Sequence, residues 1–213
     1  MARTMPRLDT QFGALARSAV DLALAGENIR SAAPAGSLFK RELSLPRLEA
    51  LYETAYLRVF LAWEEFLEQT FLRYICGYAS ALGSCTLTRP AFRNIADANV
   101  DVLGPRDFVS WADPRAVIRR SQAYTTLGFH ETVLNSDLSR LILFKSVRNR
   151  IAHSSEHARD EFDAATRTLT SKRYLASSAG RFLRDRATTM PFPKTWLESV
   201  TDELVSLSVQ VCS

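Results

Sequence analysis

Several residue types are scarce in this chain, and each scarcity excludes a class of protein. There are only 3 cysteines and no CxxC pair, which argues against a disulfide scaffold or a structural zinc site and favours a reducing cytoplasm. The 8 glycines and 8 prolines among 213 residues exclude collagen-like and low-complexity chains. The longest apolar stretch, residues 56–63, contains Arg58 and ends at Glu64, whereas a bilayer span takes about 20 apolar residues. No apolar segment of a signal peptide follows Arg3 and Arg7. We therefore expect a globular cytoplasmic protein without a membrane segment.

Lysine is scarce as well, so the positive charge is carried by arginine. Of the 27 basic side chains 23 are arginines, and the formal net charge is +4. The lysines are Lys40, Lys145, Lys172 and Lys194. Because the planar guanidinium group suits phosphates and carboxylates, an anionic partner is one interpretation. Codon bias in a GC-rich genome is the other, and composition alone favours it.

Helical periodicity of apolar residues runs through most of the chain and predicts an all-α fold. A first helix is expected over residues 9–25, ending near Gly26. Residues 80–105 are rich in turn-forming residues and are expected to form a long loop with at most one helical turn. Further helices are expected over 46–77, over 107–124 with a kink or restart at Pro114, from Leu138 to about Ile151, and from about Pro193 to the end. A mainly solvated segment is expected over 156–169. The chain is therefore predicted to be a single domain, 1–213, with a bundle core at about 47–170 and a long insertion between its central helices.

The longest expected helix carries a wide aromatic stripe between Tyr52 and Tyr74. Such a stripe needs several neighbours to cover it, either within the bundle or in a dimer. The stripe is one reason to expect a homodimer.

Signatures of several common enzyme classes are missing from the sequence. There is no GxxxxGK[ST], GxGxxG, HExxH or GxSxG pattern, so P-loop, Rossmann, zincin and α/β-hydrolase chemistry has no support. Only His130, His153 and His157 are available for histidine chemistry. On one continuous helix His153 and His157 would share a face, which allows a metal site with a nearby carboxylate. A helix break at Ser154 would separate them instead, and we predict neither a metal nor a cofactor.

The segment from Val147 to Ser155 concentrates the remaining polar chemistry of the chain. At about 100° per residue, Arg148 and His153 lie about 140° apart around the helix, with Asn149 between them. One broad face therefore carries a guanidinium, an amide and an imidazole. Cationic side chains also suit the C-terminal end of a helix, so a well-finished helix end is the alternative interpretation.

The residues Arg148-Asn149-Arg150-Ile151-Ala152-His153 resemble the R-x4-6-H motif of the HEPN superfamily, including the frequent polar residue after the arginine. The apolar run over 141–147 looks like the helix that leads into this motif. The segment over 56–68, with its Trp-Glu-Glu sequence, is similar to the opening core helix of stand-alone HEPN-like nucleases. The resemblance covers about residues 47–170.

What the resemblance implies is a helical bundle that cleaves RNA without a metal, with a composite cleft across a homodimer. His153 would act as general base or acid on the ribose 2′-OH, Arg148 would stabilise the developing phosphorane charge, and Asn149 would orient the phosphate. Such nucleases act as toxins or in anti-phage defence, with an antitoxin or regulatory protein as a further partner. Some members carry a tyrosine two residues after the histidine, which a nucleotidyltransferase antitoxin modifies. Ser155 stands there in this chain, so the resemblance does not extend to that mode of neutralisation.

Independent physical reasoning supports the same chemistry. Attack by a 2′-OH group needs no metal where an imidazole moves protons and a cation meets the developing charge. Basic side chains that would bind RNA phosphates around the motif are Arg119, Arg120, Arg140, Lys145 and Arg150. Two alternatives stay open: a non-catalytic HEPN interaction module in a defence or regulatory complex, and a metal-dependent enzyme using His153 and His157.

Overall fold

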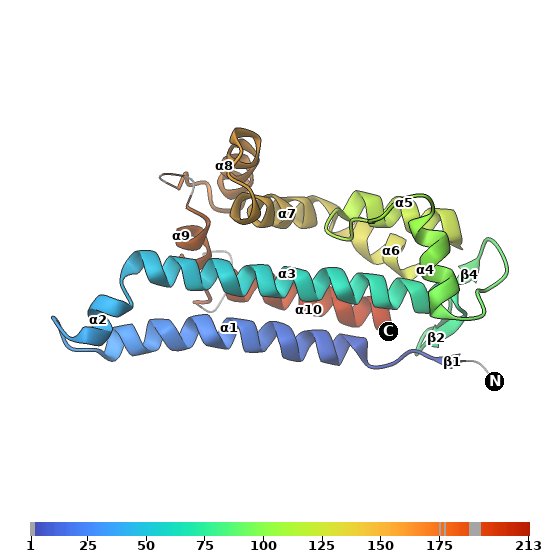
Figure 1. Ribbon diagram of the computed structural model, residues 1–213, viewed down its shortest axis with the longest axis horizontal. Helices are drawn as coiled ribbons and strands as arrows, with labels where there is room; N and C mark the ends of the chain where they lie inside the picture. Colours follow the sequence, from blue (N-terminus) through green and yellow to red (C-terminus); the bar gives the residue numbers. More distant parts are fainter. Residues whose placement is uncertain (1–2, 175, 177, 188–192) are drawn as a thin grey trace. The chain divides into compact units, whose positions relative to one another are not determined.

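A computed structural model describes residues 3–174, 176, 178–187 and 193–213 (Figure 1). Helices dominate and the strands are only two or three residues long, which confirms the all-α class. The chain forms two compact units: the first comprises Met1–Gly13, Ala62–Ile142 and Leu204–Ser213, and the second Ala14–Leu61 and Leu143–Glu203. The single domain with its core at 47–170 and the HEPN-like arrangement stay predictions. No helix of the described residues is long and apolar enough to span a lipid bilayer.

The second unit contains most of the helix pair α1 (Leu8–Ala32) and α3 (Leu45–Ile75), which run antiparallel and are joined through α2 (Leu38–Glu42) (Figure 1). The expected end of the first helix near Gly26 is wrong, because α1 continues for another turn and a half. A Cβ atom at Gly26 would lie 3.0 Å from Leu51 Cδ1 and 3.3 Å from Leu48 Cδ2. Glycine therefore serves close helix packing here instead of ending a helix.

The rest of the second unit is built from the C-terminal part of α7 (Leu138–Ala152), from α8 (Glu156–Thr170) and α9 (Ala179–Arg184), and from the start of α10 (Trp196–Cys212). The Phe182 ring stacks on Trp196 at a centroid distance of 5.3 Å and meets Phe162 edge-on at 6.1 Å. Arg184 forms two hydrogen bonds with Glu27, at 2.9 and 3.0 Å, which tie α9 to α1. The expectation that 156–169 is mainly solvated is wrong, since α8 buries Phe162 fully as part of an apolar face.

In the first unit, the segment expected as a long loop contains regular structure. The strands β1 (Arg3–Thr4), β2 (Tyr78–Ser80) and β3 (Gly83–Ser84) form a sheet in that order, with β1 parallel to β2 and β2 antiparallel to β3. The strands β4 (Thr86–Leu87) and β5 (Thr125–Thr126) pair antiparallel. A nine-residue helix, α4 (Ile95–Leu103), follows, and the Asn94 side chain caps it by accepting the Asp97 N–H at 2.9 Å. Local capping thus built a helix where composition indicated a loop.

Helices α5 (Pro114–Tyr124) and α6 (Phe129–Ser136) pack side by side in the same unit (Figure 1). The helix expected over 107–124 begins only at Pro114, so the helical structure expected over 107–113 is wrong. Pro114 occupies the first turn of α5, and Asp113 caps it by accepting the Arg115 N–H at 3.0 Å.

The aromatic stripe of α3 is buried within the chain. Exposure is 1% for Tyr52, 0% for Tyr56, 3% for Trp63 and 1% for Phe71 and Tyr74. The stripe is therefore covered within the chain, the first of the two alternatives, and it no longer supports a homodimer, which stays a prediction.

Candidate functional site

The polar segment from Val147 to Ser155 forms the last turn of α7 and the junction with α8. Phe144 and Val147 are buried at 1% and 0% exposure and seat this part of the helix in the second unit. The backbone N–H of His153 donates to the Asn149 carbonyl oxygen at 2.9 Å, so the helical hydrogen-bond pattern extends to His153. The arrangement therefore keeps Asn149 between Arg148 and His153 around the helix, as predicted.

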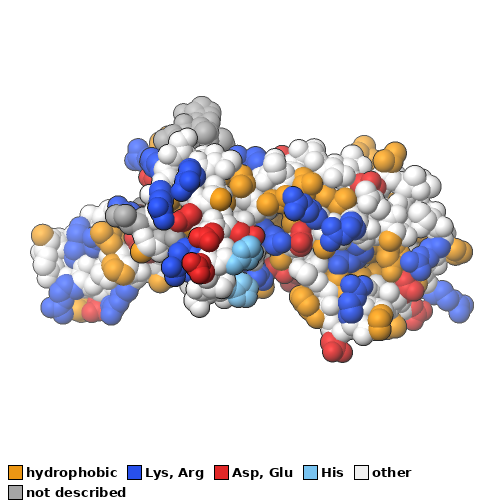
Figure 2. Space-filling view, turned by 90° about the horizontal axis from the view of Figure 1, so that it is seen from above, with side chains coloured by type: hydrophobic (Ala, Val, Ile, Leu, Met, Phe, Trp, Pro, Cys, Tyr) orange, Lys and Arg blue, Asp and Glu red, His pale blue; other side chains and the backbone are white. Residues whose placement is uncertain are grey.

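The side chains of this turn differ in exposure. Arg148 and Asn149 are half-buried, whereas His153 is exposed at the end of the helix. Accessible imidazole is what a proton shuttle between protein and substrate requires. Figure 2 shows histidine side chains at the surface with acidic and basic side chains beside them.

Arg150 has a local structural role at this helix end. Its Nη1 donates to the His153 carbonyl oxygen at 3.3 Å. The last carbonyl groups of a helix lack intrahelical partners, and a guanidinium there also complements the helix dipole. For Arg150, this contact agrees with the alternative interpretation, in which the polar side chains of the motif stabilise the C-terminal end of the helix.

The two neighbouring histidines do not share one continuous helix. The main chain leaves the helix after Ala152, and Ser155 caps α8 by accepting the Ala158 N–H at 3.2 Å. His157 lies in the first turn of α8, where its Nε2 is 3.4 Å from Glu161 Oε1. Among the described residues, no three His, Cys, Asp or Glu side chains gather in a way that would hold a metal ion. The helix break at Ser154 is thus the interpretation that the fold confirms.

The other basic residues predicted to bind RNA are distributed over both units. Lys145 lies in the second unit and Arg140 in the first, both half-buried on α7. Arg119 and Arg120 lie on α5 in the first unit, Arg119 exposed and Arg120 half-buried. A common phosphate-binding rim made of these side chains stays a prediction.

Arg120 is engaged inside its own unit. Its guanidinium lies 4.2 Å from the centre of the Trp111 ring, and its Nη2 donates to the Ser110 carbonyl oxygen at 3.3 Å. Burial lowers the pKa of Arg120 to about 10. A desolvated guanidinium stacked on an indole stabilises the fold around it, so this residue has a structural role that the sequence did not predict.

His130 also has a role that sequence reasoning missed. Its side chain is buried in the first unit, with Nε2 2.9 Å from Thr70 Oγ1 and 3.2 Å from the Leu67 carbonyl oxygen. Burial lowers its pKa to about 4, so the ring is neutral at physiological pH. The only sequence feature that could have identified this role is a single histidine on an apolar helix face, a pattern that indicates a hydrogen-bonded core residue.

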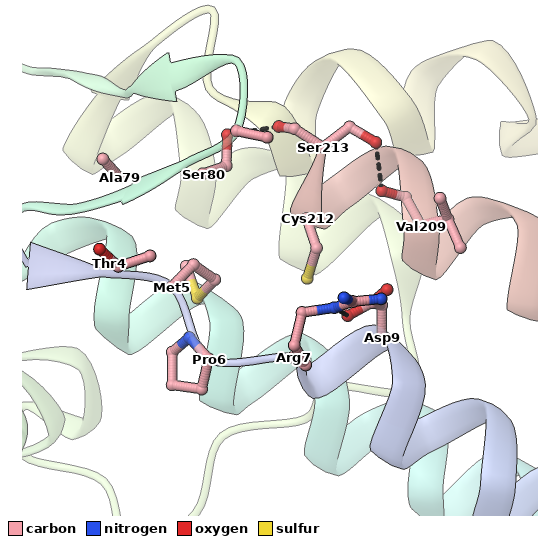
Figure 3. A pocket seen from close by; sticks show the side chains of 11 residues that line it. Thr4, Met5, Pro6, Arg7, Asp9, Ala79, Ser80, Val209, Cys212 and Ser213 are labelled. Atoms are coloured by element: carbon pink, nitrogen blue, oxygen red, sulfur yellow. Dashed lines mark hydrogen bonds and ion pairs between the residues drawn. The ribbon is translucent and has the colours of Figure 1, made fainter.

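Two pockets open in the first unit, and no motif residue lines either. One of about 340 Å³ lies between the segment around β1 and the end of α10, where Met5, Arg7, Ser80 and Cys212 line it (Figure 3). Burial raises the pKa of the Cys212 thiol to about 11, so this cysteine is a poor nucleophile. The other pocket, of about 320 Å³, has Glu65, Glu68, Phe108 and Trp111 among its lining residues.

The chain matches no protein-family model, and neither a curated protein nor a solved structure shows significant similarity to it.

Proposed function

We propose that this protein is a metal-independent endoribonuclease whose active site is built around Arg148, Asn149 and His153. The observation that carries the proposal is the exposed imidazole of His153 on the same helix end as the Arg148 guanidinium, with the Asn149 amide between them. The R-x4-6-H spacing shared with the HEPN superfamily supports it.

The chemistry would proceed by transfer of an RNA 2′-OH proton to neutral His153. The 2′-oxygen attacks the adjacent phosphorus, and Arg148 stabilises the charge on the equatorial oxygens of the phosphorane-like transition state. The bond to the 5′-oxygen breaks, and that oxygen takes a proton from a second, protonated imidazole. The products are a 2′,3′-cyclic phosphate and a free 5′-OH group. The reaction requires neither a metal ion nor a redox partner.

Each chain has one copy of the motif, so we take the second imidazole from the motif of another protomer. We therefore place the cleft across a homodimer, with Arg148 and His153 contributed twice. A role as a toxin or anti-phage effector, neutralised by an antitoxin or regulatory protein, follows from the family resemblance alone.

The decisive experiment is cleavage of single-stranded RNA in EDTA, with analysis of the product ends. We expect 2′,3′-cyclic phosphate ends from the wild type and a loss of at least about 100-fold in rate for His153→Ala and Arg148→Ala. His157→Ala is the matched control, since it removes an exposed histidine four residues away that has no assigned role. Cleavage by His153→Ala at the wild-type rate would contradict the proposal.

A non-catalytic interaction module is the second candidate function, and the contact of Arg150 with the His153 carbonyl oxygen favours it. This contact shows that part of the motif finishes a helix. The alternative predicts no RNA cleavage in any condition, and unchanged binding of a partner by the Arg148→Ala and His153→Ala variants.

A further inference from the structure

An exposed apolar stripe runs along α1 in the second unit. Leu15, Leu22 and Ile29 follow one another at intervals of seven residues and are 60%, 50% and 50% exposed. Single exposed apolar side chains are common on protein surfaces. Three at a strict heptad spacing on one helix match the pattern of a coiled-coil seam instead.

Small residues complete this seam. Ser18, Ala25 and Ala32 are exposed and alternate with the three large side chains at intervals of three and four residues. The six positions form one line about 26 Å long at about 1.5 Å per residue. The opposite side of α1 carries Ala16 and Ala23, both fully buried, so this helix already has its intrachain contacts elsewhere.

We propose that the α1 seam packs antiparallel against the same seam of a second copy of this chain. The reason is self-complementarity: when two such helices run antiparallel, every large side chain of one meets a small side chain of the other. The facing pairs, each formed twice, are Leu15 with Ala32, Ser18 with Ile29 and Leu22 with Ala25 of the second copy. A column of large residues beside a column of small ones thus fits a two-fold interface, in which both partners use the same patch.

A parallel arrangement lacks this fit. It would set Leu22 against Leu22 and Ala25 against Ala25, so that crowded layers would alternate with empty ones, which close packing disfavours. The antiparallel register also sets the exposed side chains of Asp21 and Asn28 opposite each other along one flank, where the amide of Asn28 can donate to the Asp21 carboxylate. Packing and polar groups therefore favour the same register.

The seam is short compared with most stable interfaces, which involve about 20–30 residues on each side. We expect a dissociation constant on the order of micromolar, so that association is measurable at ordinary protein concentrations. The contact uses α1 and not the motif helix α7, so it is independent of the proposed ribonuclease activity. If the motif also pairs across protomers, two isologous contacts on one chain give a tetramer or a larger assembly.

Sedimentation equilibrium of the full chain between about 1 and 200 μM tests the register directly, in the range that suits an interface of this size. We expect Leu22→Ala to leave a gap and Ala25→Leu to cause crowding, each weakening association at least about tenfold. The double variant Leu22→Ala/Ala25→Leu exchanges large and small within one antiparallel layer, and we expect it to associate within about threefold of the wild type. Alanine and leucine are both strong helix formers, so the helix persists, and the melting temperature checks this.

Val100→Ala is the matched control, because Val100 is 69% exposed on α4 and lies outside the seam. We expect it to leave association unchanged. Conversion of a wild-type tetramer into dimers by the single α1 variants supports the proposal equally. A wild type that stays monomeric throughout, single variants that associate like the wild type, or a double variant weaker than either single one would each overturn it.

Discussion

The hydroxyl group of Tyr56 donates a buried hydrogen bond to the main-chain carbonyl oxygen of Phe144, over 2.9 Å. Tyr56 lies on α3 and Phe144 on α7, four residues before Arg148, and both side chains are at most 1% exposed. Burial raises the pKa of the Tyr56 hydroxyl well above its ordinary value, so the group stays protonated and keeps donating. This bond ties the motif-bearing end of α7 to the central helix of the second unit.

We predict that Tyr56→Phe lowers the free energy of unfolding by about 1–2 kcal/mol, because a buried hydrogen bond is lost while the ring packing is kept. Urea denaturation at neutral pH measures the difference. Tyr52→Phe is the matched control, since it removes the hydroxyl of another buried tyrosine of α3, 1% exposed, and leaves the Tyr56 bond in place. Equal stability losses for the two variants would show that the Tyr56 bond adds nothing.

The long helices could be predicted because their signals are local and repeated. Apolar positions of α3 recur over many turns, and Pro114 marks the start of α5, where Asp113 caps the first turn. The motif turn of α7 could be located for the same reason, since helical spacing alone relates Arg148 to His153. These are properties of a helix by itself.

Other features depend on contacts with residues outside the same helix turn, so the local sequence pattern does not predict them. Gly26 looks like a helix end, but the close approach of Leu48 and Leu51 makes it a packing site inside α1. Arg120 looks like one of many surface arginines until Trp111, nine residues earlier, stacks against it. Whether His153 meets a second imidazole depends on a partner chain, which neither sequence spacing nor a single chain determines.

A pH-dependent loss of stability follows from the buried neutral ring of His130. Its pKa falls from the ordinary 6.5 to about 4 on folding, so the unfolded chain binds an extra proton between these pH values. The contribution is therefore fully present above pH 6.5 and is lost as the pH falls towards 4. We expect His130 to remove about 2–3 kcal/mol of stability between pH 7 and pH 4.5.

Urea denaturation at pH 7 and pH 4.5 measures this loss, and comparison with His130→Gln isolates it from the titration of carboxylates. We expect the stability difference between the two pH values to shrink by about 2 kcal/mol in this variant, because an amide does not titrate. His157→Gln, at an exposed position, should keep the wild-type difference. An unchanged difference in His130→Gln would mean that the ring has the same pKa in the folded and the unfolded chain.

Arg119 and Arg120 are neighbours on α5 with opposite expected roles, and this contrast tests the proposed RNA contact. Arg119 is exposed, so Arg119→Ala should change the free energy of unfolding by no more than about 0.5 kcal/mol. If Arg119 contacts a phosphate, the slope of log affinity against log salt concentration should fall by about one in this variant.

Arg120→Ala removes the stacking on Trp111 and the hydrogen bond to the Ser110 carbonyl oxygen, so we expect the free energy of unfolding to fall by about 1–3 kcal/mol. The salt slope of RNA binding by the folded variant should not change. Anisotropy titrations of labelled RNA at several salt concentrations, with melting curves of each variant, separate the two effects. A reduced slope in Arg120→Ala at unchanged stability would assign the phosphate contact to Arg120 and make its packing on Trp111 secondary.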